Sequence, residues 1–245
     1  MLKQLAKNAV RRFPSVSNPI WKLIYPRARR DRYETYEQFD SRAEAFRNIF
    51  LNNWWEADES RSGWGSTMAA TAPLRRRLPG VLRKLGARSL LDAPCGDFHW
   101  MRHVDLGEVA YIGADIVPEI ISELSRTFAG ERRRFEVLDI VVGPMPVADV
   151  WLCRDVLAHL PLGDIKQVLS NFADSEVKFL LAAWQPLATV NRDMSAGGFR
   201  TINLRLPPFN LPRPLLAFDD FVVPATPQSL GLWSNDQLRA WRAKL

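Results

Sequence analysis

Apolar residues in the second half of the chain form short runs that alternate with segments of helical spacing. The runs predict strands at Ser89 to Ala93, Ala110 to Asp115, Phe135 to Leu138, Asp149 to Cys153, and Lys178 to Trp184. The segments between them predict helices at about His99 to Val104, Pro118 to Phe128, and Asp164 to Phe172. This alternation predicts an α/β domain with a mostly parallel sheet and helices on both faces.

Residues 36–88 have a different pattern, which predicts a helical cap ahead of the sheet. Apolar residues at helical spacing predict an amphipathic helix within Tyr36 to Trp55. A loop of small residues follows from Glu59 to Thr67 and leads into a second helical stretch. We expect Pro79-Gly80 to interrupt that stretch, which ends near Gly86.

Residues 1–35 form a basic arm, although the whole chain has a net charge of only +6. Nine basic residues stand against Asp31 alone between residues 1 and 33, so the rest of the chain is slightly acidic. Such an arm is either a solvated tail or a segment that contacts anionic surfaces, and it predicts weak contact with a membrane surface.

Composition limits where this chain works. Its two cysteines, Cys95 and Cys153, are too few for a disulfide framework. No apolar run approaches the ~18 residues of a membrane span. We therefore expect a cytoplasmic protein.

His99 and His103 lie four residues apart, but no third ligand has a recognisable spacing, so we expect no metal.

The segment from Asp92 to Phe98 is the most informative part of the sequence. It follows a buried strand and leads into a predicted helix, where backbone N–H groups face a ligand. In open α/β sheets, ligands bind beyond the carboxyl ends of strands. Asp115 ends the next strand and lies about 20 residues after Gly96, the spacing at which an acid reaches ribose hydroxyls. These features predict a site for a nucleoside-like cofactor.

The order of these motifs resembles that of class I S-adenosylmethionine-dependent methyltransferases. The matching residues are Leu91 to Asp97 after the first strand, Asp115 after the second, Leu138 to Ile140 after the third, and Cys153 to His159 after the fourth. A bacterial subgroup shares the pattern Asp-x-Pro-Cys-Gly-Asp-Phe-x-Trp-Met, and its two further motifs match Ser62 to Ser66 and Arg200 to Phe209. The resemblance implies a Rossmann-like, doubly wound, mostly parallel seven-stranded sheet over residues 89–245, with an N-terminal helical extension over residues 36–88.

The resemblance also implies which residues bind S-adenosyl-L-methionine. Gly96 allows close approach of the backbone, and Asp97 either accepts from the ammonium or caps the next helix. Asp115 accepts from the ribose hydroxyls, and Asp139 accepts from the adenine amino group. The full set is Asp92, Pro94, Cys95, Gly96, Asp97, Asp115, Ile116, Asp139, Ile140 and Arg154.

The acceptor side is less defined. His159 is the candidate general base, since histidine titrates near neutral pH. Asp155 lies four residues earlier, so one helical turn would place both side chains on the same face. A packed structural histidine is the alternative. The segment from Gln185 to Pro214 is either a substrate-binding lid or a rigid covering loop. The candidate substrate-binding residues are Trp64, Asn191, Arg200 and Asn203.

We therefore predict a methyltransferase that acts on a small-molecule, glycan or other carbohydrate-like acceptor, at oxygen. A dinucleotide-dependent oxidoreductase is disfavoured, because no G-x-G-x-x-G follows the first strand. Two alternatives stay open: a methyltransferase-like binding protein without activity, and a nucleic-acid methyltransferase. We expect no stable complex with nucleic acid.

Overall fold

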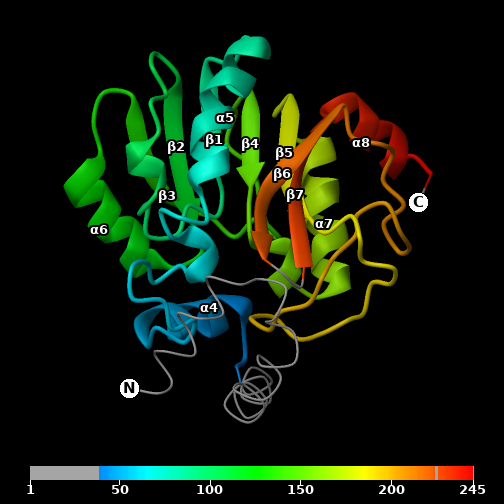
Figure 1. Cartoon of the computed structure of the whole chain (residues 1–245), viewed down its shortest axis with the longest axis horizontal. Helices are drawn as coiled ribbons and strands as arrows, with labels where there is room; N and C mark the ends of the chain where they lie inside the picture. Colours follow the sequence, from blue (N-terminus) through cyan, green and yellow to red (C-terminus); the bar gives the residue numbers. More distant parts are fainter. Residues whose placement is uncertain (1–38, 224–225, 245) are drawn as a thin grey trace.

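The computed structural model describes residues 39–223 and 226–244 (Figure 1). The helices are α4 (Arg42–Leu51), α5 (Ala72–Lys84), α6 (Pro118–Phe128), α7 (Leu162–Asp174) and α8 (Asn235–Arg242). The strands are β1 (Ser89–Asp92), β2 (Ala110–Asp115), β3 (Arg133–Val137), β4 (Val150–Cys153), β5 (Phe179–Trp184), β6 (Leu216–Val223) and β7 (Thr226–Ser234). Short 3-10 turns lie at Trp64–Ser66, Met101–His103 and Leu157–His159.

The strands form one seven-stranded sheet in the order β3-β2-β1-β4-β5-β7-β6. The first five strands pair in parallel, and β7 runs antiparallel to both β5 and β6. The mostly parallel, seven-stranded sheet is therefore confirmed. The chain winds outward from β1 toward β3 and then from β4 toward β6, so its direction reverses between β1 and β4. Ligands of open α/β sheets bind at such a reversal.

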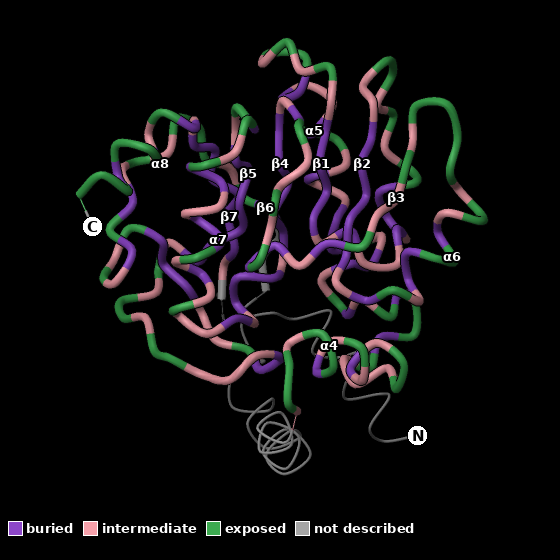
Figure 2. Tube along the Cα trace, turned by 180° about the vertical axis from the view of Figure 1, so that it is seen from behind, coloured by how far each residue is buried: buried purple, intermediate pink, exposed green. Residues whose placement is uncertain are grey.

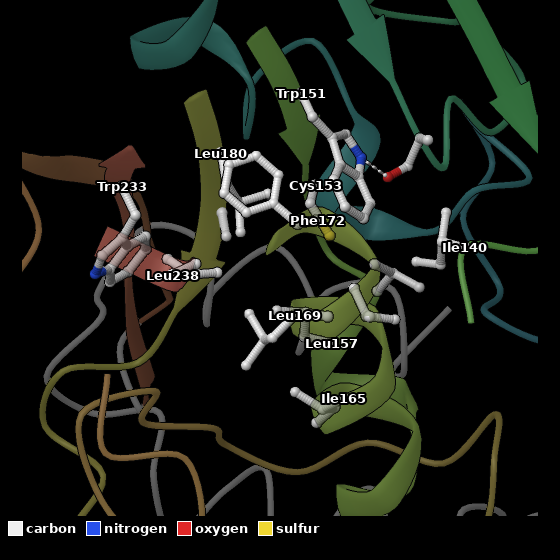
Figure 3. Close-up of a cluster of buried hydrophobic side chains, with 14 of the residues drawn as sticks. Ile140, Trp151, Cys153, Leu157, Ile165, Leu169, Phe172, Leu180, Trp233 and Leu238 are labelled. Atoms are coloured by element: carbon white, nitrogen blue, oxygen red, sulfur yellow. Dashed lines mark hydrogen bonds between the residues drawn. The ribbon is translucent and has the colours of Figure 1, made fainter. Parts of the chain in front are cut away.

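Each face of the sheet has its own apolar core, because successive strand residues point to opposite faces. Leu90 and Leu152 pack under α5 and α6, whereas Leu91 and Trp151 pack under α7 and α8. Figure 3 shows the second core, in which the Trp151 indole N–H donates to the Ala93 carbonyl at 2.8 Å. The central strands are buried along their length (Figure 2). This packing fixes the strand ends that form the site.

Several predicted helices have different limits. α4 is shorter than the segment from Tyr36 to Trp55, and the stretch from His99 to Val104 forms only a 3-10 turn. The predicted break at Pro79-Gly80 is wrong, since α5 continues through both residues. Proline removes one helical hydrogen bond there, but the helix buries Leu78 and Val81 on either side of it, and that burial offsets the loss.

The two helices of the predicted cap lie apart: α4 crosses the carboxyl edge of the sheet, below the strands in Figure 1, whereas α5 packs on one face of the sheet. The predicted basic arm, residues 1–35, falls outside the described residues, so its membrane contact stays a prediction. The division into an arm, a cap and a sheet domain also stays a prediction. Among the described residues, no helix is long and apolar enough to cross a bilayer.

Candidate active site

A cavity opens at the carboxyl ends of β1, β2 and β4. The turn after β1 forms its floor, and α4 with the loop that follows it forms its cover. Its charged lining residues are Arg42, Asp92, Asp115, Asp139, Arg154 and Asp155. Its apolar and aromatic lining includes Phe46, Phe50, Trp55, Trp100, Ile116, Val117, Leu138, Ile140 and Val156. Four carboxyl groups against two guanidinium groups give the cavity an excess of negative charge.

Asp115 ends β2 at the cavity wall. Its two carboxylate oxygens accept from the backbone N–H groups of Gly96 and Val117, each at 3.1 Å. Burial raises the pKa of Asp115 to about 6. Because each carboxylate oxygen has a second lone pair, Asp115 can still accept from a pair of ligand hydroxyls.

Asp92 lies at the end of β1, on the cavity floor. The Tyr111 hydroxyl donates to its carboxylate at 2.7 Å, and burial raises the pKa of Asp92 to about 7. Burial also raises the pKa of the thiols of Cys95 and Cys153, which stay protonated and therefore pack as small apolar side chains.

Asp97 fastens the loop from Glu59 to Thr67, called the cap loop below, onto the turn after β1. Its carboxylate accepts from the Ser60 hydroxyl at 2.8 Å, from the Arg61 backbone N–H at 2.9 Å and from the Ser62 hydroxyl at 3.2 Å. It also accepts from the His99 backbone N–H at 3.2 Å, as a cap of the following turn would. Asp97 therefore holds the wall of the cavity together.

Gly96 of that turn lies directly against Ser62 of the cap loop. Its φ is +54°, in the left-handed region that favours glycine. A Cβ atom at this position would lie 2.2 Å from the Ser62 hydroxyl oxygen. Glycine is needed here for both reasons.

Asp139 and Ile140 follow β3 and line the far side of the cavity, as Ile116 does after β2. The Arg42 guanidinium of α4 bridges Asp139 at 2.9 Å and Asp164 at 3.0 Å. This pair of contacts holds α4 over the cavity. Asp139 thus lies where the sequence predicts a cofactor contact, and it is also paired with Arg42.

Arg154 follows β4 and is almost completely buried at the cavity wall. It pairs with Asp155 at 3.1 Å and donates to the Gly65 carbonyl of the cap loop at 3.0 Å. The guanidinium carbon of Arg154 lies 5.6 Å from the centroid of the Trp100 ring. Arg154 therefore joins the end of β4 to the cap.

His159 lies outside the cavity lining, behind Trp55. The centroid of its ring lies 5.4 Å from that of Trp55 and 5.6 Å from that of Phe199. Its Nδ1 lies 2.5 Å from the Gly198 carbonyl oxygen. The predicted helical turn from Asp155 to His159 does not form, because Asp155 has a left-handed φ of +55° and a 3-10 turn follows. Asp155 lines the cavity, whereas His159 is not among the lining residues and packs against Trp55, which is.

The predicted substrate-binding residues of the segment from Gln185 to Pro214 do not reach the cavity. Asn191 and Asn203 hydrogen-bond to backbone groups within the segment, including a 2.8 Å bond from the Asn203 N–H to Asn191. Arg200 donates to the carbonyls of Leu157, Leu160 and Arg192. These contacts favour the rigid covering loop over the lid. Trp64 lies on the cap with 43% of its surface exposed.

The fold is shared with known enzymes, although no protein-family model and no curated protein matches the sequence. Magnesium protoporphyrin IX methyltransferase from Synechocystis PCC 6803 with bound SAH has a TM-score of 0.57 and 12% identity. That match covers 78% of this chain and 97% of the other. The 1,6-didemethyltoxoflavin-N1-methyltransferase of Burkholderia thailandensis, with its substrate and S-adenosylhomocysteine bound, has a TM-score of 0.55 and 16% identity, covering 79% and 86%. The chain has the fold of class I S-adenosylmethionine-dependent methyltransferases. At such low identity the likeness establishes the fold alone.

Sequence reasoning missed most of the cap's contribution to this cavity. Arg42, Phe46, Phe50 and Trp55 line it from α4 and the turn after it, and Ser62 and Ser66 line it from the loop. Only the loop motif from Ser62 to Ser66 pointed to these contacts. Within the described part of the chain, no cluster of histidine, cysteine or acidic residues is arranged to hold a metal ion.

Proposed function

We propose that this chain is an S-adenosylmethionine-dependent methyltransferase with a small-molecule acceptor. The observation that supports this most is the position of Asp115. It ends β2 beside the strand reversal, and its carboxylate lines a cavity rich in negative charge. Acids at this position bind ribose hydroxyls in nucleotide-binding α/β proteins.

The residues present fit the proposed methyl donor. Ile116, Val117, Leu138 and Ile140 supply an apolar slot for a purine ring. The excess of carboxyl groups suits a molecule that carries both a sulfonium and an ammonium, and it disfavours the anionic diphosphate of a dinucleotide. When bound, the donor supplies an activated methyl group on a sulfonium leaving group.

The protein's own task is positioning and electrostatics. Asp115 would hold the ribose, while the loop held by Asp97 and Arg154 would close the amino-acid end of the donor and exclude water. Asp97 itself already accepts four hydrogen bonds from the chain, which favours its capping role over a contact with the donor ammonium.

Methylation of an oxygen on a carbohydrate-like acceptor would require a base. Because a carbonyl only accepts, His159 Nδ1 must donate to Gly198, which leaves the basic lone pair of the neutral ring on Nε2. Its position behind Trp55 gives this oxygen chemistry less support than a reaction beside Asp155, which lines the cavity.

The test is incubation of the purified protein with methyl-labelled S-adenosylmethionine and a small-molecule extract, followed by chromatography. We expect formation of S-adenosylhomocysteine and transfer of the label to a small molecule. Donor binding without any turnover would instead favour the inactive binding protein. Label recovered only in added RNA or DNA would favour the nucleic-acid methyltransferase.

A further inference from the structure

Polar side chains at the ends of four neighbouring strands form one buried network beside the cavity. The members are Arg154 and Asp155 after β4, Gln185 after β5, Asp220 in β6, and Gln228 in β7. The Gln228 amide donates to Asp155 at 2.5 Å and to Asp220 at 2.9 Å, and it accepts from Gln185 at 2.7 Å. Arg154 donates to Asp220 at 2.8 Å and pairs with Asp155. The two carboxylates therefore share one guanidinium and one amide.

This network holds one cation, Arg154, for two carboxylates. Asp220 is completely buried, and its Oδ1 has no hydrogen-bond partner among the residues that the structure describes. Burial raises the pKa of Asp220 even though Arg154 lies beside it, as expected for a carboxyl group that is incompletely compensated. The buried Asp220 and the partly buried Asp155 share one cation, and the net negative charge that remains is unfavourable until a cation or a proton donor reaches the network.

Asp155 is the point where the network meets the cavity. Its side chain is 27% exposed and lines the cavity together with the almost completely buried Arg154, whereas Asp220 is sealed behind them. Its left-handed backbone is uncommon for a residue other than glycine, and such conformations concentrate at functional sites. β4 neighbours β1, so Asp155 lies across the strand reversal from Gly96.

We infer that the methyl acceptor is an amine whose nitrogen is held by Asp155; this inference rests on the proposed methyltransferase function. The lone pair of the neutral amine forms the new carbon–nitrogen bond as the carbon–sulfur bond breaks. The electrons of that bond remain on sulfur, and the positive charge moves from sulfur to nitrogen. The Asp155 carboxylate accepts an N–H hydrogen bond from the neutral amine before transfer and pairs with the ammonium product after it. The proton of that ammonium passes to water after transfer, so the attack itself requires no base.

Acceptors of other classes fit this network less well. A hydroxyl must lose its proton to attack, and the resulting alkoxide would lie beside carboxylates that already lack a cation. A carboxylate acceptor would add a further like charge. The aromatic rings of Trp55 and Trp100 line the same cavity, and ring faces attract an ammonium but not an anion. Charge therefore selects nitrogen over oxygen.

The test compares nitrogen and oxygen acceptors of the same shape. Methyl-labelled S-adenosylmethionine is offered with benzylamine, N-methylbenzylamine and further small amines, each paired with the alcohol of matching skeleton. Asp155→Asn removes the charge but keeps the shape, and asparagine tolerates the left-handed backbone. Asp219→Asn is the matched control, because Asp219 is an exposed neighbour of Asp220 outside the network. Calorimetry with S-adenosylhomocysteine measures binding of the donor product to each variant.

We expect label on amines alone. In Asp155→Asn, kcat/KM for amines should fall roughly 10- to 100-fold, the loss expected for a hydrogen bond to a charged group, with unchanged S-adenosylhomocysteine affinity. Asp219→Asn should behave as the parent. Label on alcohol oxygens, equal amine rates in the two variants, or donor binding with no amine methylated would each overturn the amine assignment and leave the donor site standing. Absence of donor binding would instead refute the proposed function.

Discussion

Substitution of Gly96 by alanine tests how the cap loop and the turn after β1 form the cavity together. Gly107 offers a matched control, because its φ of +55° is almost the same as the +54° of Gly96. A Cβ atom at Gly107 would meet nothing within 4 Å, whereas at Gly96 it would lie 2.2 Å from the Ser62 hydroxyl oxygen. Both variants thus carry the free-energy cost of a left-handed alanine, but only Gly96→Ala places a Cβ atom against Ser62.

The magnitudes follow from these contacts. Left-handed alanine costs roughly 1 kcal/mol, which is the whole effect expected for Gly107→Ala. In Gly96→Ala, Ser62 must also move, and its two hydrogen bonds with Asp97, at 2.9 and 3.2 Å, are lost. At roughly 1 kcal/mol for each bond, the total loss of unfolding free energy is roughly 3 kcal/mol.

Urea unfolding measures the stability difference, and calorimetry with S-adenosylmethionine measures donor affinity. We expect Gly96→Ala to lose roughly 10-fold or more in affinity, because displacement of the loop opens the wall of the cavity. Gly107→Ala should bind the donor as the parent does. Equal unfolding free energies and equal affinities in the two variants would refute the idea that Gly96 positions the loop through Ser62.

Three further predictions concern other parts of the molecule. Arg42→Ala should weaken donor binding, because α4 loses its two anchors over the cavity, whereas calorimetry on Arg47→Ala, which breaks an exposed ion pair of the same helix, should show no change. Burial raises the pKa of Asp92 to about 7, so the native state holds more protons than the unfolded chain between about pH 4 and about pH 7. Its contribution to stability therefore falls as pH rises toward 7, and Asp92→Asn should flatten that fall in urea titrations from about pH 5 to about pH 8. Arg200→Ala should lower the unfolding free energy by roughly 2 kcal/mol, since it loses bonds to three carbonyls, while leaving donor affinity unchanged. A change in acceptor KM without a loss of stability would favour the lid instead.

The sheet could be predicted from the sequence because its signals are local. β2 and α6 have the predicted limits, since an apolar run ends at Asp115 and Pro118 starts the helix. Parallel strands buried on both faces leave continuous apolar runs, which are short and easily recognised. The donor side of the candidate site lies at the ends of these strands, so its position follows from them.

The cap and the acceptor side could not be predicted in the same way, because they depend on contacts between distant residues. Arg42 reaches Asp139 and Asp164, both far along the chain, and no local pattern marks such an ion pair. Asp155 adopts a left-handed backbone inside a network completed by β6 and β7, so a helical pairing with His159 was the wrong local geometry. Polar residues of the long loop suggested ligand contacts, but Asn191 and Asn203 bond to the loop's own backbone, and Arg200 also bonds to the carbonyls of Leu157 and Leu160.

We expect S-adenosylmethionine to bind at the carboxyl ends of β1 and β2 through Asp115. Calorimetric titration of the purified chain and of Asp115→Ala with this donor tests it most directly, with circular dichroism confirming that the variant is folded. We predict saturable binding to the parent and a loss of roughly 100-fold in the variant, as two charge-assisted hydrogen bonds disappear. No binding to the parent, or equal affinity in a folded Asp115→Ala variant, would show that the donor does not bind through Asp115.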